Sequence, residues 1–213
     1  MNSCDTMAVA NGSLSTSTPL QSKMTTRAPD ASAGNSGQAW WAATRDTEAT
    51  FYLDASMSLS TMFASGLAFA RPELKIWAFM GDGAFCMNPG MLMVERQMNL
   101  PNLTHFLVSN RVYGATSNAG LPNVDKNDYA AIARAMGLDR VFELADLAAL
   151  ERDLPALVTG NMAGHTFVVL EVEPFSDAEQ KLEQPPFDGA ELKYRFGRHI
   201  EARTDCNIFG YRL

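Results

Sequence analysis

Short apolar runs alternate with amphipathic segments along most of this chain, and no other feature constrains its fold as strongly. Four apolar runs have the length of buried strands: 75–80, 103–109, 140–144 and 166–172. Four segments carry apolar residues at helical spacing: 59–70, 87–99, 128–136 and one that begins after Asp146. Parallel strands joined by helices bury both faces of their sheet. The sequence therefore predicts an α/β fold, a doubly wound parallel sheet with helices on both faces.

The 213 residues suffice for one substantial core, and 46% hydrophobic with 19% charged residues is ordinary for a globular domain. Residues 1–38 contain almost no large apolar side chains and are rich in Ser, Thr, Asn, Gly and Ala. Such a segment buries too little to offset its ordering entropy, so we predict a flexible arm there. The domain itself is expected over 39–175. The predicted domain does not require the extension 176–213, which we expect to be a partner-binding arm, a lid or a solvated tail.

Charge and cysteine content exclude several classes of function. The formal net charge is −7 and no basic cluster occurs, which argues against a nucleic acid or an anionic membrane as partner. The 3 cysteines are far apart and form no CxxC pair, which argues against zinc and cysteine-held iron–sulfur clusters. No apolar stretch has the length of a membrane span, and the N-terminus lacks a signal pattern. We therefore expect a cytoplasmic protein.

Gly81-Asp82-Gly83 follows the apolar run at 76–80 and carries the strongest chemical signal in the chain. Glycine lets the backbone approach a phosphate closely, and a helix that starts here offers free amides and a positive dipole end to an anion. Asp82 is expected at the rim of the sheet. Its carboxylate is a hard oxygen ligand of the kind that Mg²⁺ prefers, and this metal normally shares its coordination sphere with phosphate oxygens.

Ser109-Asn110 ends the next apolar run along the chain. Ligands of parallel sheets bind beyond the carboxyl ends of the strands, so Asp82 and Asn110 are expected to meet there. The amide oxygen of Asn110 adds a metal contact without adding negative charge beside a diphosphate. The loop 111–124, rich in Gly, Asn and Ser, is expected to close over the site. Together these residues predict a divalent-metal diphosphate site.

This arrangement resembles the pyrophosphate-binding domain of thiamine-diphosphate-dependent enzymes, which carries Gly-Asp-Gly and, at the end of the next strand, Asn-Asn. The resemblance covers roughly residues 47–175 and implies thiamine diphosphate and Mg²⁺ as cofactors. Carried over, it assigns the metal to Asp82, Asn110 and the carbonyl of Val112. The cofactor-binding residues implied in this part of the chain are Gly81, Asp82, Gly83, Ala84, Asn110, Val112, Tyr113 and Gly114.

The segment Phe51-Tyr52-Leu53-Asp54-Ala55-Ser56-Met57-Ser58 is similar to one in subunits of sulfopyruvate and phosphonopyruvate decarboxylases, written there Phe-Tyr-Met-x-Gly-Ser-Met-Gly. The resemblance implies that Met57 wedges under the cofactor and bends it. It also implies that the carbonyl of Ala55 accepts a hydrogen bond from the aminopyrimidine. Ser56 lies between them and is assigned to the same site.

Four positions depart from the family's pattern. Ser109 replaces the first Asn of the metal motif, and Met91 stands where relatives usually carry Glu. Ala55 and Ser58 replace two glycines. If the backbone at these two positions needs a positive φ, their side chains cost conformational energy.

Thiamine chemistry uses a thiazolium carbon that attacks a 2-oxo acid. In the family, a Glu from a separate pyrimidine-binding domain starts this chemistry, and this chain has no second α/β unit to carry it. We therefore expect no catalytic residue on this chain. A pyrimidine-binding partner subunit is expected to supply the Glu, in a dimer of heterodimers. The resemblance implies a lyase, a decarboxylase or carboligase of small 2-oxo acids.

Two other interpretations stay open. The metal loop also resembles that of the α-type subunit of 2-oxo acid dehydrogenases, although Val112 interrupts the Asn-Arg-Tyr-Gly order found there. A non-catalytic relative that binds the cofactor, or only a partner, is the other interpretation. The replaced glycines and Met91 favour it.

Overall fold

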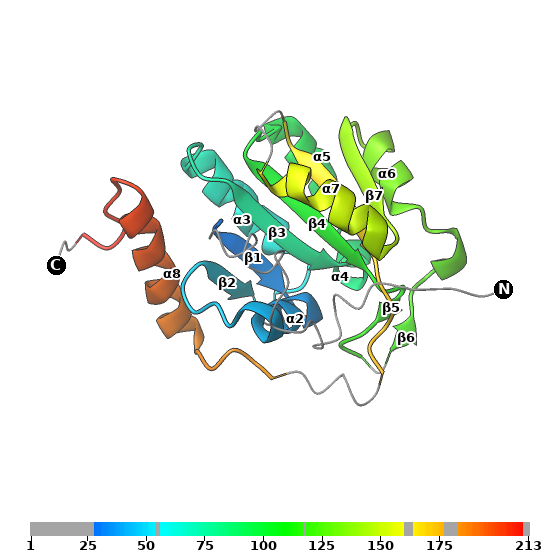
Figure 1. Cartoon of the computed structure of the whole chain (residues 1–213), viewed down its shortest axis with the longest axis horizontal. Coiled ribbons are helices and arrows are strands. Elements are labelled where there is room, and N and C mark those ends of the chain that lie inside the picture. The colour runs from blue at the N-terminus through cyan, green and yellow to red at the C-terminus, as the bar shows by residue number, and fades with distance from the viewer. Residues whose placement is uncertain (1–27, 54–55, 117, 160–163, 177–182, 211–213) are drawn as a thin grey trace.

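Six parallel strands form the central sheet of this protein, in the order β2-β1-β3-β4-β8-β7 (Figure 1). The computed structural model describes residues 28–53, 56–116, 118–159, 164–176 and 183–210. The strands are β1 (Asp30–Ala33), β2 (Thr50–Leu53), β3 (Ile76–Gly81), β4 (Leu103–Ser109), β7 (Arg140–Leu144) and β8 (Thr166–Glu171). A separate antiparallel ribbon pairs β5 (Val112–Tyr113) with β6 (Ala119–Gly120).

Helices cover both faces of this sheet, which confirms the predicted doubly wound α/β fold (Figure 1). They are α2 (Asn35–Thr44), α3 (Ser60–Ala70), α4 (Asp82–Met87), α5 (Met91–Met98), α6 (Tyr129–Ala135), α7 (Leu147–Thr159) and α8 (Gly189–Arg203), with a 3-10 helix at Val124–Lys126. Side chains alternate along β3: Ile76, Ala78 and Met80 pack toward α3 to α6, whereas Trp77 and Phe79 pack toward α2 and α7. None of the described helices is long and apolar enough to cross a membrane.

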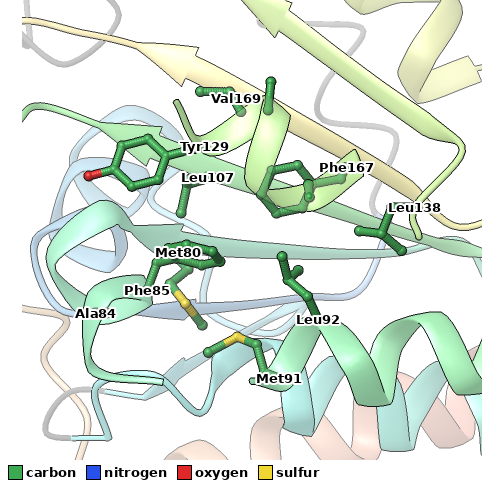
Figure 2. Close-up of a cluster of buried hydrophobic side chains, with 12 residues drawn as sticks. Met80, Ala84, Phe85, Met91, Leu92, Leu107, Tyr129, Leu138, Phe167 and Val169 are labelled. Atoms are coloured by element: carbon green, nitrogen blue, oxygen red, sulfur yellow. The ribbon is translucent and has the colours of Figure 1, made fainter. Parts of the chain in front are cut away.

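The central core lies where α4, α5 and α6 pack on β3, β4 and β8 (Figure 2). Phe85 of α4 meets the ring of Tyr129 edge-on, with centroids 5.6 Å apart, and Leu92 of α5 is fully buried. Burial of each such side chain contributes about 1.5–3 kcal/mol. Because α4 begins at Asp82, the packing of Phe85 fixes the place of that carboxylate.

Part of the arm predicted at the N-terminus is folded. Residues 30–33 form β1, a strand between β2 and β3, and α2 starts at Asn35, so the arm expected over 1–38 is wrong for these residues. The prediction relied on large apolar side chains, but β1 has the sequence Asp-Ala-Ser-Ala and is buried throughout. Small side chains suit this strand because Ala64 and Ala68 of α3 pack against it. Residues 1–27 lie outside the described part of the chain.

The helix expected over 87–99 is shorter than predicted: α5 covers Met91–Met98, and Met87 is the last residue of α4. Pro89 between them has no N–H to donate and disfavours a helical conformation in the residue before it, so the helix is interrupted there. The strands at 103–109 and 140–144 have the predicted bounds, the strand at 76–81 is shifted by one residue from the predicted 75–80, and the strand at 166–171 ends one residue earlier than predicted.

The extension after residue 175 contains α8, which lies along the edge strand β2 (Figure 1). Phe196 meets the ring of Phe51 edge-on, with centroids 5.4 Å apart, and Ile200 is buried in the same cluster as Ala64 and Ala68. A solvated tail is therefore wrong for this part of the extension. The helix belongs to the domain and covers apolar surface at the edge of its sheet.

Candidate functional site

The carboxyl ends of β3, β4 and β8 meet at one edge of the sheet. In the register of these strands, Gly81 lies beside Val108, and Ser109 lies beside Glu171. A pocket opens at this edge, as expected for a parallel sheet. Most of the predicted site residues line it: Met57, Gly81, Asp82, Gly83, Ala84, Asn110, Val112, Tyr113 and Gly114.

Asp82 is 1% exposed and is held by three neutral donors. Its Oδ1 accepts a hydrogen bond from the amide of Gly83 at 2.9 Å. Its Oδ2 accepts one from the amide of Arg111 at 2.8 Å and one from the hydroxyl of Ser109 at 3.2 Å. Ser109, which replaces the family's first Asn, therefore still orients the carboxylate.

The charge of Asp82 is not compensated by these donors alone. Burial raises the pKa of the Asp82 carboxyl, and the nearby negative charge of Glu171 adds to this, while the three hydrogen bonds lower it in part. The net shift is upward. A buried carboxylate with a raised pKa gains stabilisation from a cation that binds beside it.

The other two proposed metal ligands lie on the loop after β4. Oδ1 of Asn110 accepts a hydrogen bond from the amide of Val112 at 3.2 Å, and the carbonyl of Val112 accepts one from the amide of Gly114 at 3.0 Å. A carbonyl or carboxylate oxygen has two acceptor positions. Asp82 Oδ1, Asn110 Oδ1 and the Val112 carbonyl therefore each retain one, and this all-oxygen set suits Mg²⁺.

Two glycines let the loop approach the sheet closely. A Cβ on Gly83 would lie 2.8 Å from Cδ1 of Tyr113, which is too close, so the Tyr113 ring packs over the start of α4 only because residue 83 is glycine. A Cβ on Gly114 would lie 3.0 Å from Nδ2 of Asn35 and 3.2 Å from Nδ2 of Asn110. The glycine after Asp82 thus serves packing as well as the phosphate approach expected from the sequence.

The second predicted segment is only partly at this site. Met57 lines the pocket and packs against the central core. Ser56 lines a neighbouring pocket instead, and Gly34 borders both. Ala55 lies outside the described residues. Ser58 has a φ of 66°, in the left-handed region that favours glycine, so the cost anticipated for a replaced glycine is present here.

Sequence reasoning missed the contribution of β1 and α2. After β1, Gly34 turns the chain at a φ of 57°, and Asn35 and Ser36 at the start of α2 line the same pocket as Asp82. The sequence feature that could have revealed this strand–turn–helix unit is Gly34, which separates the short segment 30–33 from the helical segment that follows. It was overlooked because the short segment has no large apolar residue.

Comparisons with known proteins define the class. Residues 32–172 match the family model of the thiamine pyrophosphate enzyme, C-terminal TPP binding domain, and the chain belongs to this family. Sulfopyruvate decarboxylase subunit beta of Methanococcus maripaludis is 29% identical over 158 residues, which are 73% of this chain and 80% of that subunit. 2-Oxoglutarate synthase subunit KorB of Archaeoglobus fulgidus is 29% identical over 86 residues, 40% of this chain and 32% of that subunit.

A solved structure shares the fold. The benzoylformate decarboxylase of Polynucleobacter necessarius superposes with a TM-score of 0.59 and 15% identity over 77% of this chain. The chain spans 32% of the length of that enzyme. The likeness therefore concerns one domain of a larger chain.

Proposed function

We propose that this chain is the pyrophosphate-binding subunit of a thiamine-diphosphate- and Mg²⁺-dependent 2-oxo acid decarboxylase or carboligase. One observation carries the proposal: Asp82 Oδ1, Asn110 Oδ1 and the Val112 carbonyl lie at one pocket of a TPP-binding domain, each with one acceptor position left. The likeness to a sulfopyruvate decarboxylase subunit over most of both chains favours decarboxylation.

In this proposal, each part of the pocket has its own task. Asp82, Asn110 and Val112 hold the metal, and the amides of Gly83 and Ala84 lie near the diphosphate, with Gly81 and Gly114 keeping the backbone close. Met57 and Tyr113 offer apolar surface to the rings of the cofactor, and Met57 wedges beneath them. When bound, thiamine diphosphate supplies a nucleophilic carbon and a sink for the electrons that decarboxylation releases.

The loop after β4 forms one side of the pocket. Val112 and Tyr113 pair with Ala119 and Gly120 in the β5–β6 ribbon, which fixes their backbone. Leu121 directly after the ribbon is 4% exposed and lies near residue 83. The loop thus orients a metal ligand and packs down on the start of α4.

A separate subunit is proposed to supply the activating Glu. Both relatives named above are subunits by their names. Among the described residues, the carboxylates that line the pocket are those of Asp82, assigned to the metal, and Glu173, which is exposed at the rim. If the activating Glu lies on the partner, replacing Glu173 must leave the reaction intact, so this variant serves as the control.

A second candidate is the corresponding subunit of an oxidative 2-oxo acid enzyme. The likeness to 2-oxoglutarate synthase subunit KorB over 40% of the chain favours it. The reaction products distinguish the two candidate functions. A decarboxylase releases carbon dioxide with a free aldehyde, and a carboligase forms a hydroxyketone, whereas an oxidative enzyme requires an electron or acyl acceptor.

The proposal is tested with the chain alone and together with a candidate pyrimidine-binding subunit. Mg²⁺-dependent binding of thiamine diphosphate is measured first, then carbon dioxide release from a panel of 2-oxo acids. Asp82→Ala is expected to lose binding, whereas Glu173→Gln is expected to retain both binding and release. Undiminished binding by Asp82→Ala contradicts the metal site. Release by the chain without a partner contradicts the split arrangement.

A further inference from the structure

Arg111 stands between two proposed metal ligands, Asn110 and Val112, but its side chain contacts a neighbouring strand. Its Nε donates to Oε2 of Glu171 at 3.0 Å, and Nη2 pairs with Oε1 of the same carboxylate. The two parallel bonds form the bidentate arrangement that gives Arg–carboxylate pairs their geometric specificity. Glu171 ends β8, where the register places it beside Ser109.

The same guanidinium also ties down the far end of the loop. Nη1 donates to the carbonyl of Asn127 at 2.7 Å and to that of Val124 at 3.4 Å. Its Cζ lies 5.2 Å from the centre of the Tyr129 ring, within the range of a cation–π contact. One side chain thus joins the ends of β4 and β8 to the 3-10 helix and α6.

The backbone of Arg111 has an unfavourable conformation, which the contacts of its side chain help to maintain. Its φ is 63°, a left-handed conformation that costs a residue with a side chain about 1–3 kcal/mol and persists only where the surroundings impose it. In this conformation the Arg111 amide donates to Oδ2 of Asp82 at 2.8 Å. The side-chain contacts of Arg111 help to hold its backbone in this conformation, and the conformation places its amide on Asp82.

We propose that Arg111 and Glu171 form a clamp that positions the metal-binding loop, holding the Arg111 amide on Asp82 and thereby setting where Asn110 and Val112 lie. Arg111 and Glu171 are positioning residues, since they act through the proposed ligands. The inference rests on the proposed function for its effect on the cofactor, but the clamp itself exists without ligand. It is anchored on a strand of the sheet, which makes it more rigid than a loop contact.

The clamp is expected to matter more for the loop than for the fold. The side chains of Arg111 and Glu171 are 35% and 20% exposed, and pairs of this kind contribute little to global stability. The matched control is Arg195→Ala, which breaks the exposed Arg195–Glu191 pair on α8. Like Arg111, Arg195 also lies over an aromatic ring, with its Cζ 4.9 Å from the centre of the Phe187 ring, so the unfolding temperature of this variant gives the shift expected from loss of an ion pair together with a cation–π contact.

The test compares Arg111→Ala, Arg111→Gly, Glu171→Ala and the charge-reversed double variant Arg111→Glu/Glu171→Arg with Arg195→Ala. Amide hydrogen exchange of residues 110–116 is measured without ligand, and Mg²⁺-dependent thiamine diphosphate binding is measured in the assembly that binds it. The three single variants at the clamp are expected to speed exchange about tenfold and to weaken binding about 10- to 100-fold, as for other outer partners of metal ligands. The double variant is expected to regain part of the protection from exchange and part of the binding affinity.

Arg111→Gly separates the clamp from a backbone role. Glycine adopts a φ of 63° at no steric cost, so a purely backbone role predicts binding at least as tight as in the wild type. The clamp predicts weaker binding instead.

The inference is overturned if exchange of residues 110–116 is unchanged in Arg111→Ala and Glu171→Ala, or if exchange rises while binding is unaffected. A wild type that fails to bind while the exchange results hold overturns the proposed function but leaves the clamp in place. The two failures are therefore distinguishable.

Discussion

Asp82 and Glu95 are both carboxylates with 1% exposure in the same domain, but different partners surround them. Neutral donors hold Asp82: two backbone amides and a hydroxyl. Two imidazoles hold Glu95 of α5, whose Oε2 lies 3.1 Å from Nδ1 of His105 and 2.9 Å from Nε2 of His165. His105 belongs to the same strand, β4, that ends beside Asp82.

The pKa values of the two carboxyls are displaced in opposite directions. Burial raises the pKa of Asp82 and outweighs its hydrogen bonds. Burial also acts to raise the pKa of Glu95, but the charges and hydrogen bonds of His105 and His165 outweigh it and lower this pKa to about 2. A carboxylate held by two imidazoles of its own domain is structural, whereas one held only by amides and a hydroxyl is suited to an external cation.

The largest effect is expected from Glu95→Ala. It leaves two buried imidazoles without their shared partner, and removing a buried charged partner in this way costs about 3–5 kcal/mol. Urea unfolding measures the loss of free energy. Glu191→Ala, which breaks an exposed pair on α8, is the control and is expected to cost about 0–1 kcal/mol. Equal losses of unfolding free energy in the two variants would contradict a structural role for Glu95.

A second prediction concerns the loop side of the metal site. Asn110→Ala removes a proposed ligand and one hydrogen bond to the Val112 amide. Loss of an interaction with a charged group costs about 1.5–3 kcal/mol, which corresponds to a decrease in Mg²⁺ affinity of about 10- to 100-fold. Titration calorimetry at saturating thiamine diphosphate measures it. Asn207→Ala, at an exposed asparagine outside the pocket, is the control, and an equal decrease there would contradict the assignment.

The pH dependence distinguishes the two carboxylates. Asp82 must lose its proton to bind a metal, and its folded pKa lies above 3.8, so Mg²⁺ affinity is expected to fall as the pH drops through that raised value, by about tenfold per pH unit below it. Glu95 has a lowered pKa, so its stability contribution is complete above pH 4.5 and is lost as the pH falls through about 2.

These two transitions are separable in a single experiment. Thermal unfolding with and without Mg²⁺ and thiamine diphosphate, repeated at several pH values, is expected to lose the ligand-induced stabilisation first and the stability of the ligand-free protein at lower pH. The reverse order would contradict the opposite shifts of the two carboxyls.

The smallest effect is expected from Ser109→Ala, which removes one of the three donors to Asp82. This hydrogen bond to the carboxylate is 3.2 Å long, beyond the usual range for an O–H···O bond, so we expect it to contribute only about 0.5–1.5 kcal/mol and Mg²⁺ affinity to fall about twofold to tenfold. Calorimetry under the conditions used for Asn110→Ala gives the comparison. A loss as large as that of Asn110→Ala would mean that Ser109 does more than orient Asp82.

The periodic part of this fold was predictable from the sequence because it depends on local patterns. The runs at 103–109 and 140–144 became strands with the expected bounds, and Tyr129 and Ala133 are buried as the helical spacing of 128–136 indicates. The meeting of Asp82 and Asn110 followed from a general property of parallel sheets. These predictions needed no knowledge of which distant residues make contact.

The remainder depended on contacts between distant segments. The helical spacing of 59–70 begins at Leu59, which lies just before α3 and is 48% exposed, while the fully buried residues of α3 are the small ones, Ser60, Thr61, Ala64 and Ala68. Helix and strand approach closely there, so small residues fit where hydrophobicity alone favours large ones. His165 lies in the loop just before β8, yet it is buried against Glu95. No sequence spacing links Glu95, His105 and His165, because only the folded sheet brings them together.

The position of α8 also has a consequence for synthesis of the chain. The stacked rings of Phe51 and Phe63, 4.3 Å apart, are covered by Phe196, so an early-made edge of the sheet is completed by a late-made helix. While residues 189–203 are still within the ribosome, the nascent chain presents an uncovered apolar edge strand, a species prone to aggregation. Truncation before α8 is therefore expected to leave an apolar edge that promotes aggregation.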